Sequence, residues 1–460
     1  MQKVLNNILR KIRPTQEEKE RMKKFSGEVM KISEEICKTY HARPMLCGSV
    51  TKNTWLSNKN ELDLFILFST GVNKKNLGAH GMEIAKAIIE KFSGGYEIAY
   101  AEHPYVRGMI KFDGGFFDID IVPCYDLKGA RKIITSVDRT PHHVKFVKEN
   151  LKMPDEVRLL KQFLKAKGIY GADVMTQGFS GYLCELMIIN HGKFERLVKD
   201  ASKWRAPVAI DLKGSIDADK AFKEYKSPLI VIDPVDPKRN VAAAVSIESF
   251  YRFVEACNKL SRKPDEKMFE IKKSKPYSIY EINKEVEKRG TKWFMIEFEK
   301  PDIVNDTLWP QLRRCMKSIE KIIESNGFSI MRNDFYCKEK CILVYEMDTW
   351  IVPKIAKNTG PNVYSRHAED FLKHYNNYKI FIENENWIVE KERKYTDIFI
   401  LLNSIVKSSK AELLRIGIPN KIAENFRNSK IYSEKDFEKM PEEFNVFMKE
   451  WFEKDIDLQS

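Results

Sequence analysis

Two short apolar segments each carry a pair of acidic residues at alternate positions. Glu61 and Asp63 interrupt the run ELDLFILF, and Asp118 and Asp120 interrupt FFDIDIVP. Alternate side chains of a strand project from one face, so each segment predicts two carboxylates side by side. Desolvating such a pair is costly unless a cation compensates it, and carboxylate oxygens suit Mg²⁺. Acids from two such strands could hold two Mg²⁺ ions, which activate a hydroxyl for attack on phosphorus and stabilise the leaving oxygen.

The sequence just before the first acidic segment is suited to binding phosphate. Gly48 allows close approach of the backbone, and Ser49 with the following N–H groups can hold phosphate oxygens near a helix start. Taken alone, Glu61 and Asp63 fit equally well an exposed strand whose acids are simply solvated. The combination with Gly48-Ser49 and the second acidic segment favours a phosphoryl-transfer site. Alternation does not rank Asp118 against Asp120.

These residues need a braced sheet, and residues 1–150 predict one mixed α/β unit. Thr15 and Glu18 have capping-box spacing, and apolar residues recur at three and four over a helix at 15–40. The other expected elements are an amphipathic helix through Met82–Phe92, strands at Tyr96–Glu102, Tyr105–Phe112 and Phe116–Pro123, and a hairpin turn at Gly114-Gly115.

Residues 151–270 predict a mostly helical central domain. Asp155 is expected to be the N-cap of its first helix and Gly168 the end. Lys161 falls in or beside the apolar stripe of this helix, an unusual place for a solvated lysine. Later elements are expected near Ser180-Gly181 (helix), at Leu229–Ile232 (strand) and at 247–260 (helix).

Residues 271–460 predict a third domain. A strand at Trp293–Phe298, a helix at 307–325 and two strands at Phe328–Phe335 and Ile342–Glu346 give a β-α-β-β order, half of a ferredoxin-like sandwich. Residues 356–395 are aromatic, basic and irregular by pattern. A helix is expected at 396–409, followed by a charged segment with helical patches.

Composition indicates a globular protein with a polyanionic partner. The 460 residues include 43% hydrophobic and 32% charged residues, and a net charge of +13 favours nucleic acid, although a solubility-tuned surface fits nearly as well. No apolar run has the length of a membrane span, so a cytoplasmic protein without a membrane partner is expected. The oligomeric state stays open, and a homo-oligomer is compatible with the sequence.

The eight cysteines are scattered, several within apolar runs, as is typical of buried, reduced thiols. Cys337 and Cys341 have no second pair or histidine near them in sequence. Paired strand positions around a turn therefore explain their spacing better than a zinc site does.

Nine segments in chain order resemble the archaeal, class I CCA-adding enzymes, the tRNA nucleotidyltransferases. They are GSVTKNTWLSNKNELDLFILF, AEHPYVRG, FDIDIVPCYD, VDRTPHH, EVRLLKQFLK, GIYGAD, GFSGYLCEL, VIDPVDPKRNVAA and PDIVNDTLWPQL, followed by weaker matches at 360–361, 381–384 and 393–396. The resemblance implies an α+β protein. Its expected parts are a polymerase-β-like catalytic head, a helical central domain and a C-terminal RNA-binding region that has a ferredoxin-like core with an insertion.

The resemblance also implies an activity, the template-independent addition of C, C and A to the 3′ end of tRNA from CTP and ATP. By this likeness Glu61, Asp63 and Asp120 are the ligands of Mg²⁺, whereas Asp118 is not a ligand. Ser49 matches a serine that binds the triphosphate.

Further nucleotide-binding positions follow from the same likeness. His143 and Tyr170 match nucleotide-contacting residues, Lys161 matches a lysine that reaches the triphosphate, and Arg239 matches an arginine near the primer end and incoming base. Lys52 stands where the family commonly has arginine. Lysine supplies the charge for the triphosphate but not the planar bidentate fork.

The partner implied is the acceptor end of tRNA, which we expect to be recognised by its A-form shape and phosphates. Candidate contacts are Trp204-Arg205, Arg313-Arg314 and Lys391–Tyr395, each of which is singly compatible with an ordinary solvated patch. Two rival functions stay open. One is a poly(A) or oligoadenylate-type polymerase, and the other is a catalytically silent RNA-binding protein on the same scaffold.

Overall fold

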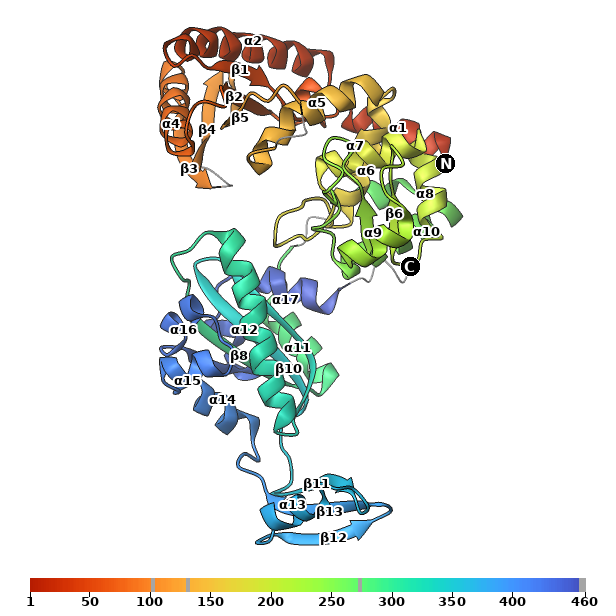
Figure 1. Ribbon diagram of the computed structural model, residues 1–460, viewed down its shortest axis with the longest axis vertical. Coiled ribbons are helices and arrows are strands. Elements are labelled where there is room, and N and C mark those ends of the chain that lie inside the picture. Colours follow the sequence, from red (N-terminus) through yellow and green to blue (C-terminus); the bar gives the residue numbers. More distant parts are fainter. Residues whose placement is uncertain (101–103, 130–132, 272–274, 455–460) are drawn as a thin grey trace. The chain divides into compact units, whose positions relative to one another are not determined.

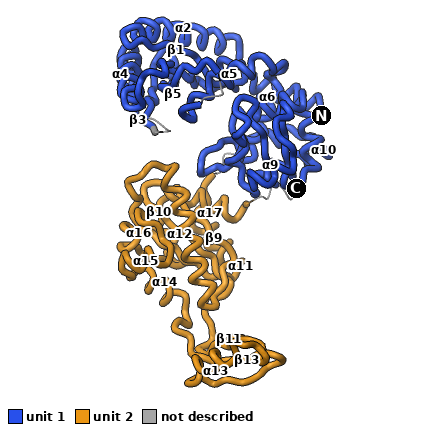
Figure 2. Tube along the Cα trace, in the orientation of Figure 1, with its two compact units in different colours: residues 1–272, 460 blue, residues 273–459 orange. Residues whose placement is uncertain are grey.

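A computed structural model describes residues 1–100, 104–129, 133–271 and 275–454. The chain folds into two compact units, one from Met1 to Lys272 and the other from Lys273 to Gln459 (Figure 2). No helix in the described ranges is long and apolar enough to cross a membrane.

A five-stranded sheet, here called the head sheet, organises the first part of unit 1. Its strands lie in the order β1-β2-β5-β4-β3, and β2 and β5 are parallel whereas the other neighbours are antiparallel. The strands are β1 (Arg43–Leu46), β2 (Glu61–Phe68), β3 (Gly95–Tyr100), β4 (Pro104–Phe112) and β5 (Gly115–Tyr125). The hairpin between β4 and β5 turns at Asp113 and Gly114, both with positive φ, one residue earlier than predicted.

Helices α2 (Gln16–Thr39) and α4 (Lys74–Lys91) pack on one face of the head sheet (Figure 1). The predicted capping box of Thr15 and Glu18 is present at the start of α2. Apolar residues of α2 and α4 bury the even-numbered side chains of β2, so the odd-numbered ones, the acids among them, point to the opposite face. The head sheet is also joined by α3 (Gly48–Thr51), η2 (Ser136–Asp138) and α5 (Arg139–Asn150).

The rest of unit 1 is mostly helical, as predicted. Its central core gathers α1 (Gln2–Ile12), α6 (Pro154–Ala166), α7 (Gly181–His191), α8 (Phe194–Ala201), α10 (Ile247–Arg262) and η3 (Glu266–Phe269). The parallel strands β6 (Val208–Ile210) and β7 (Leu229–Val231) lie beside α9 (Ala218–Tyr225).

Helix α1, for which the sequence carried no prediction, packs Leu5, Ile8 and Ile12 into the central core. One local feature of unit 1 differs from the sequence prediction. The first central helix has Met153 as its N-cap and Pro154 as its first residue, so the N-cap role predicted for Asp155 is wrong. Proline is favoured there because its missing N–H has no helical partner at that position.

Unit 2 contains a four-stranded antiparallel sheet in the order β14-β8-β10-β9. It confirms the predicted β-α-β-β order, with β8 (Lys292–Glu299), α12 (Asn305–Ser325), β9 (Ser329–Cys337) and β10 (Lys340–Thr349), to which β14 (Lys430–Ser433) is added at the edge. One face packs against α12, α14 (Ile398–Val406), α15 (Lys410–Arg415) and α16 (Asn420–Phe426), and the other against α11 (Ile279–Arg289), η4 (Glu434–Lys439) and α17 (Phe444–Phe452).

Residues 356–395, which were predicted to be irregular, contain strands and a helix. Strands β11 (Ile355–Asn362), β13 (Asn386–Glu392) and β12 (Lys379–Glu383) form a small antiparallel sheet, accompanied by α13 (Ala368–His374). This sheet is inserted in sequence between β10 and α14. Few side chains of β11 and β12 are buried, so their sequences lack the apolar alternation that would have predicted strands.

The cysteines follow the prediction with one exception. Cys37, Cys47, Cys124, Cys184, Cys257 and Cys315 are buried free thiols. Cys337 and Cys341 occupy paired positions around the β9–β10 turn, as expected, but they form a disulfide there and are not reduced thiols.

Candidate active site

Four carboxylates gather on one face of the head sheet because β2 and β5 run in parallel. In their register Glu61 lies opposite Asp118, and Asp63 lies opposite Asp120. These four residues are called the carboxylate face below. The predicted alternation on each strand is therefore present, and the pairing of the strands places the two acidic pairs next to each other.

The same face changes from polar to apolar along β2. Beyond the acids, Phe65 and Leu67 are buried with Cys47 and with Val144 of α5. Glu61 and Asp118 are exposed, and Asp63 and Asp120 are half-buried. Helix α5 thus covers only the far half of the face and leaves the acids accessible.

Basic residues contact two of the four acids. Arg107 of β4 donates through Nε to Oδ1 of Asp120 at 3.0 Å, and Lys59 Nζ lies 2.8 Å from Oε1 of Glu61. In the described part of the chain, no cation pairs with Asp63, and no group of three or more acidic, histidine or cysteine side chains is gathered closely enough to form a ready metal centre.

Asp63 is a half-buried acid of the carboxylate face without an ion-pair partner among the described residues. Burial and the neighbouring charge of Asp120 raise its pKa to about 6, against a smaller opposing effect of Lys52. Gly48 packs directly on this carboxylate, since a Cβ added to Gly48 would lie 1.7 Å from Oδ2 of Asp63. Gly48 also has φ of +68°, so glycine is required there for both reasons.

Ser49 follows Gly48 in the short helix α3 and is half-buried. The backbone around it is held by hydrogen bonds from the Cys47 N–H to the Asp63 carbonyl and from the Thr54 N–H to the Ser49 carbonyl. The serine is thereby positioned one residue from the glycine that contacts Asp63. The predicted phosphate-binding role of Ser49 stays a prediction, and the structure shows that this residue lies next to the carboxylate face.

The two predicted triphosphate lysines meet at one buried cluster, which joins the head sheet to the central core. Lys52 Nζ lies 2.5 Å from Oε2 of Glu185, a fully buried residue of α7. Glu185 also accepts a hydrogen bond from the Thr54 hydroxyl at 2.8 Å. Lys161 donates to both the carbonyl and the hydroxyl oxygen of Thr54, at 3.0 and 3.1 Å.

Lys161 is buried in α6, as its place in the apolar stripe suggested. Burial lowers its pKa, and the attraction of Glu185 opposes that effect. Tyr170 lies nearby and is half-buried. A Cβ added to Gly181 would come within 3.2 Å of the Tyr170 hydroxyl and 3.8 Å of Lys161 Nζ. The two predicted nucleotide-binding side chains thus converge on the start of α7.

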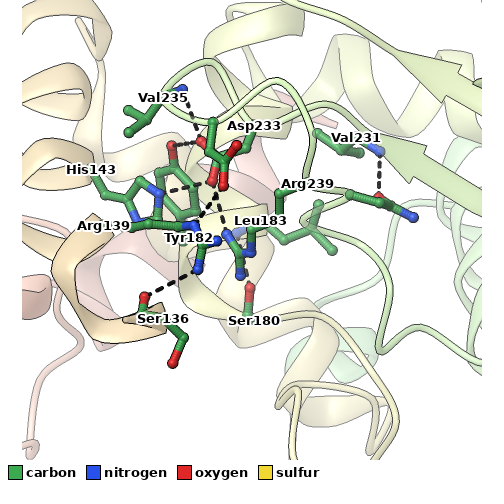
Figure 3. A network of polar contacts seen from close by, with 12 residues as sticks. Ser136, Arg139, His143, Ser180, Tyr182, Leu183, Val231, Asp233, Val235 and Arg239 are labelled. Carbon is green, nitrogen blue, oxygen red and sulfur yellow. Dashed lines mark hydrogen bonds and ion pairs between the residues drawn. The ribbon is translucent and has the colours of Figure 1, made fainter. Parts of the chain in front are cut away.

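His143 and Arg239 belong to a second network, centred on Asp233 (Figure 3). His143 Nε2 lies 2.9 Å from Oδ2 of Asp233, and Arg239 donates to the same oxygen at 2.9 Å. Oδ1 accepts from the Tyr182 hydroxyl at 3.1 Å and from the Val235 N–H at 3.0 Å. The rings of His143 and Tyr182 stack at 3.8 Å.

Arg107, Glu185 and Asp233 are among the residues of these sites that sequence reasoning missed. Glu185 did carry a signal, because it is an acid within the apolar helical run of α7. Arg107 and Asp233 lie inside segments that were recognised for other residues. Their partners are distant in sequence or on another strand, so spacing alone did not identify them.

Several side chains that were predicted to contact RNA make contacts within the protein. Trp204 packs against the central core, Arg393 donates to the Asn326 carbonyl, and the Tyr395 hydroxyl is hydrogen-bonded to Ser404. Residues 101–103, at the start of the AEHPYVRG segment, lie outside the described residues.

Two family models match parts of the chain. The model of the tRNA nucleotidyltransferase second domain matches residues 155–270, and the model of the CCA-adding enzyme C-terminal domain matches residues 289–430. The CCA-adding enzyme of Methanocaldococcus jannaschii is 37% identical over 444 residues, covering 94% of this chain and 95% of its own length. The enzyme of Archaeoglobus fulgidus is 38% identical over 400 residues, covering 86% and 87%.

The chain belongs to the CCA-adding enzyme family. It is therefore a tRNA nucleotidyltransferase, with the family's second domain at residues 155–270 and its C-terminal domain at residues 289–430. Among solved structures, a Cid1 poly(U) polymerase bound to MgATP is similar with a TM-score of 0.48 at 14% identity, covering 58% of this chain and 98% of its own. The CdnC protein of E. coli MS115-1, solved with ATP, has a TM-score of 0.44 at 16% identity, covering 58% and 94%.

Proposed function

We propose that this member of the family adds C, C and A to the 3′ end of tRNA from CTP and ATP, without a template and with release of pyrophosphate. The observation that carries the proposal is the parallel register of β2 and β5, which sets Asp63 beside Asp120 next to Gly48-Ser49. The proposed substrate implies a cytoplasmic protein that binds the acceptor end of tRNA.

The carboxylate face fits a hard divalent cation, for which we propose Mg²⁺. Its donors are carboxylate oxygens, and the pKa of Asp63 is raised by burial and by the neighbouring charge of Asp120, so an added cation would relieve the repulsion. Glu61, Asp63 and Asp120 would hold the metal after exchanging the contacts with Lys59 and Arg107. When bound, such cations would activate the tRNA 3′-hydroxyl and offset the charge of the leaving pyrophosphate.

The chain's own residues would bind and orient the nucleotide. An ammonium group has three donors, so Lys161 keeps one and Lys52 keeps two beyond the contacts described above. These donors and the Ser49 hydroxyl would bind the triphosphate. Tyr170 and His143 would contact the nucleotide, and Arg239 would lie near the primer end and incoming base.

The test is addition to tRNA that lacks its CCA end, with CTP and ATP present together and the 3′ sequence of the product determined. We expect a product ending in CCA. A run of A would show a poly(A)-type enzyme instead, and tRNA binding without addition would show a silent RNA-binding protein.

A further inference from the structure

Asp233 is a fully buried carboxylate that lies outside the predicted site residues, yet two of those residues contact it. It is reached from three directions, by His143 of α5, by Tyr182 of α7 and by Arg239 of its own loop (Figure 3). The loop itself is closed by the hydrogen bond from the Val235 N–H to Oδ1. A carboxylate surrounded by donors on both oxygens is stabilised in its ionised form.

The pKa of Asp233 agrees with this geometry. Burial alone would raise it, but the hydrogen bonds from His143, Val235 and Arg239 outweigh burial and lower the pKa to about 2. An ionised carboxylate only accepts hydrogen bonds. The 2.9 Å contact between His143 Nε2 and Asp233 Oδ2 is therefore a hydrogen bond in which Nε2 carries the proton and donates it.

The hydrogen bond made by Nε2 also determines whether Nδ1, the other ring nitrogen of His143, carries a proton. Burial lowers the pKa of this imidazole, against the opposing effect of Asp233, which favours the neutral ring. A neutral ring with its proton on Nε2 has an unprotonated Nδ1, which is a hydrogen-bond acceptor. Within the described residues, no hydrogen bond to Nδ1 of His143 is found.

We propose that Asp233 is a positioning residue, which fixes His143 in the tautomer with an accepting Nδ1 and holds Arg239 beside it. The accepting nitrogen would receive a hydrogen bond from a ribonucleoside triphosphate, either from a ribose hydroxyl or from the exocyclic amine that cytosine and adenine share. This role rests on the proposed function, because His143 and Arg239 are assigned to the nucleotide by family resemblance.

The first test is the tautomer of His143 in the full chain. The protein has eight histidines, and ¹⁵N-histidine labelling with long-range ¹H–¹⁵N correlation distinguishes the tautomers. The signal that disappears in a His143→Gln variant identifies the residue. We expect the proton on Nε2. A proton on Nδ1 in the unaltered protein overturns the proposal, whatever any variant does.

The second test compares Asp233→Asn with Tyr182→Phe and Asp236→Asn. The asparagine side chain keeps the volume but can present either an oxygen or an amine to His143, so we expect mixed tautomers and KM values for CTP and ATP raised about tenfold, with kcat within about threefold. Tyr182→Phe keeps the stacked ring but removes one donor to Oδ1, so its KM should rise less than that of Asp233→Asn. The matched control is Asp236→Asn, which changes an aspartate of the same loop that pairs with Arg139, so tautomer and KM should stay near the wild-type values. Equal increases in KM in Asp233→Asn and Asp236→Asn would show a general effect on this loop and refute the proposal.

Nucleotide analogues separate the two sources of the hydrogen bond. 2′,3′-Dideoxy-CTP lacks both ribose hydroxyl donors, and UTP carries a carbonyl where CTP has its amine. The KM penalty of Asp233→Asn should disappear with the analogue that lacks the donor, and persistence with both overturns the role of Nδ1. If the unaltered protein adds no nucleotide to tRNA, the proposed function fails, and binding of CTP to wild-type and Asp233→Asn proteins then tests the positioning role separately.

Discussion

Asp63 and Asp233 are aspartates of the same unit in opposite electrostatic conditions. Asp63 lies beside another carboxylate, and its pKa is raised to about 6. Asp233 is more deeply buried but accepts four hydrogen bonds, and its pKa is lowered to about 2. The number of donors around the carboxylate, and not burial alone, decides which way the pKa moves.

The carboxylate face around Asp63 would be stabilised by an added cation, whereas the carboxylate of Asp233 already has its partners within the protein. The carboxylate face concentrates negative charge that Arg107 and Lys59 compensate only in part. The networks of Asp233 and Glu185 are closed by groups of the protein itself and join the head sheet to the central core. The first arrangement suits metal-dependent chemistry, and the second suits the positioning of substrate-binding residues.

The largest expected effect is the loss of a carboxylate from the open site. Asp63→Asn or Asp120→Asn should lower the rate of addition by about a thousandfold, because roughly 4 kcal/mol of transition-state stabilisation would be lost with the metal. Asp118→Asn, on the same strand face, is the matched control and should stay within about threefold. Single-turnover extension of tRNA measures all three, and equal losses in all three variants would contradict the ligand assignment.

The next effect concerns the closed network around Glu185. Glu185→Ala removes one partner of a buried ion pair and should lower the free energy of unfolding by about 3 kcal/mol. Glu149→Ala, which removes an exposed glutamate of α5, should change it by less than about 0.5 kcal/mol. Urea unfolding measures both variants. A Glu185→Ala protein as stable as the wild type would show that the pair with Lys52 is not formed in the folded protein.

A smaller effect should appear on acidification. The pKa of His143 is lower in the folded protein than its ordinary value, chiefly because of burial, so between these values the unfolded chain binds more protons. Stability conferred by neutral His143 is therefore present at pH 7 and is lost as the pH falls through the unfolded pKa of about 6.5. The stability difference between wild type and His143→Gln, measured by urea unfolding, should shrink from pH 7 to pH 5. An increase over that range would reverse the assigned sign.

The smallest effect is expected for Lys52→Arg. The guanidinium keeps the positive charge beside Glu185 and adds the bidentate fork common in the family. KM for CTP and ATP should therefore change by less than about threefold. Lys52→Met provides the contrast, since it leaves the buried Glu185 without its cation and should impair both stability and nucleotide binding. A large loss in Lys52→Arg would show that the compact ammonium itself is required.

Structural features that depend on the spacing of nearby residues were predicted correctly. The alternation of Glu61 with Asp63, the capping box of α2 and the burial of Lys161 all follow from periods of two or of three to four residues. The β-α-β-β order of unit 2 is local in the same sense. The weakly amphipathic strands β11 and β12 were missed because their pattern carried little information.

Contacts between distant segments were decided only by the tertiary structure. The sequence determined which acids share a face of each strand, but the parallel pairing of β2 with β5 placed Asp63 beside Asp120. Likewise, an apolar pattern marks a face of α1 without naming its partner, and the fold directs it to the central core. Pairing and packing depend on which distant surfaces exclude water together, and that choice belongs to the whole chain and not to any one segment.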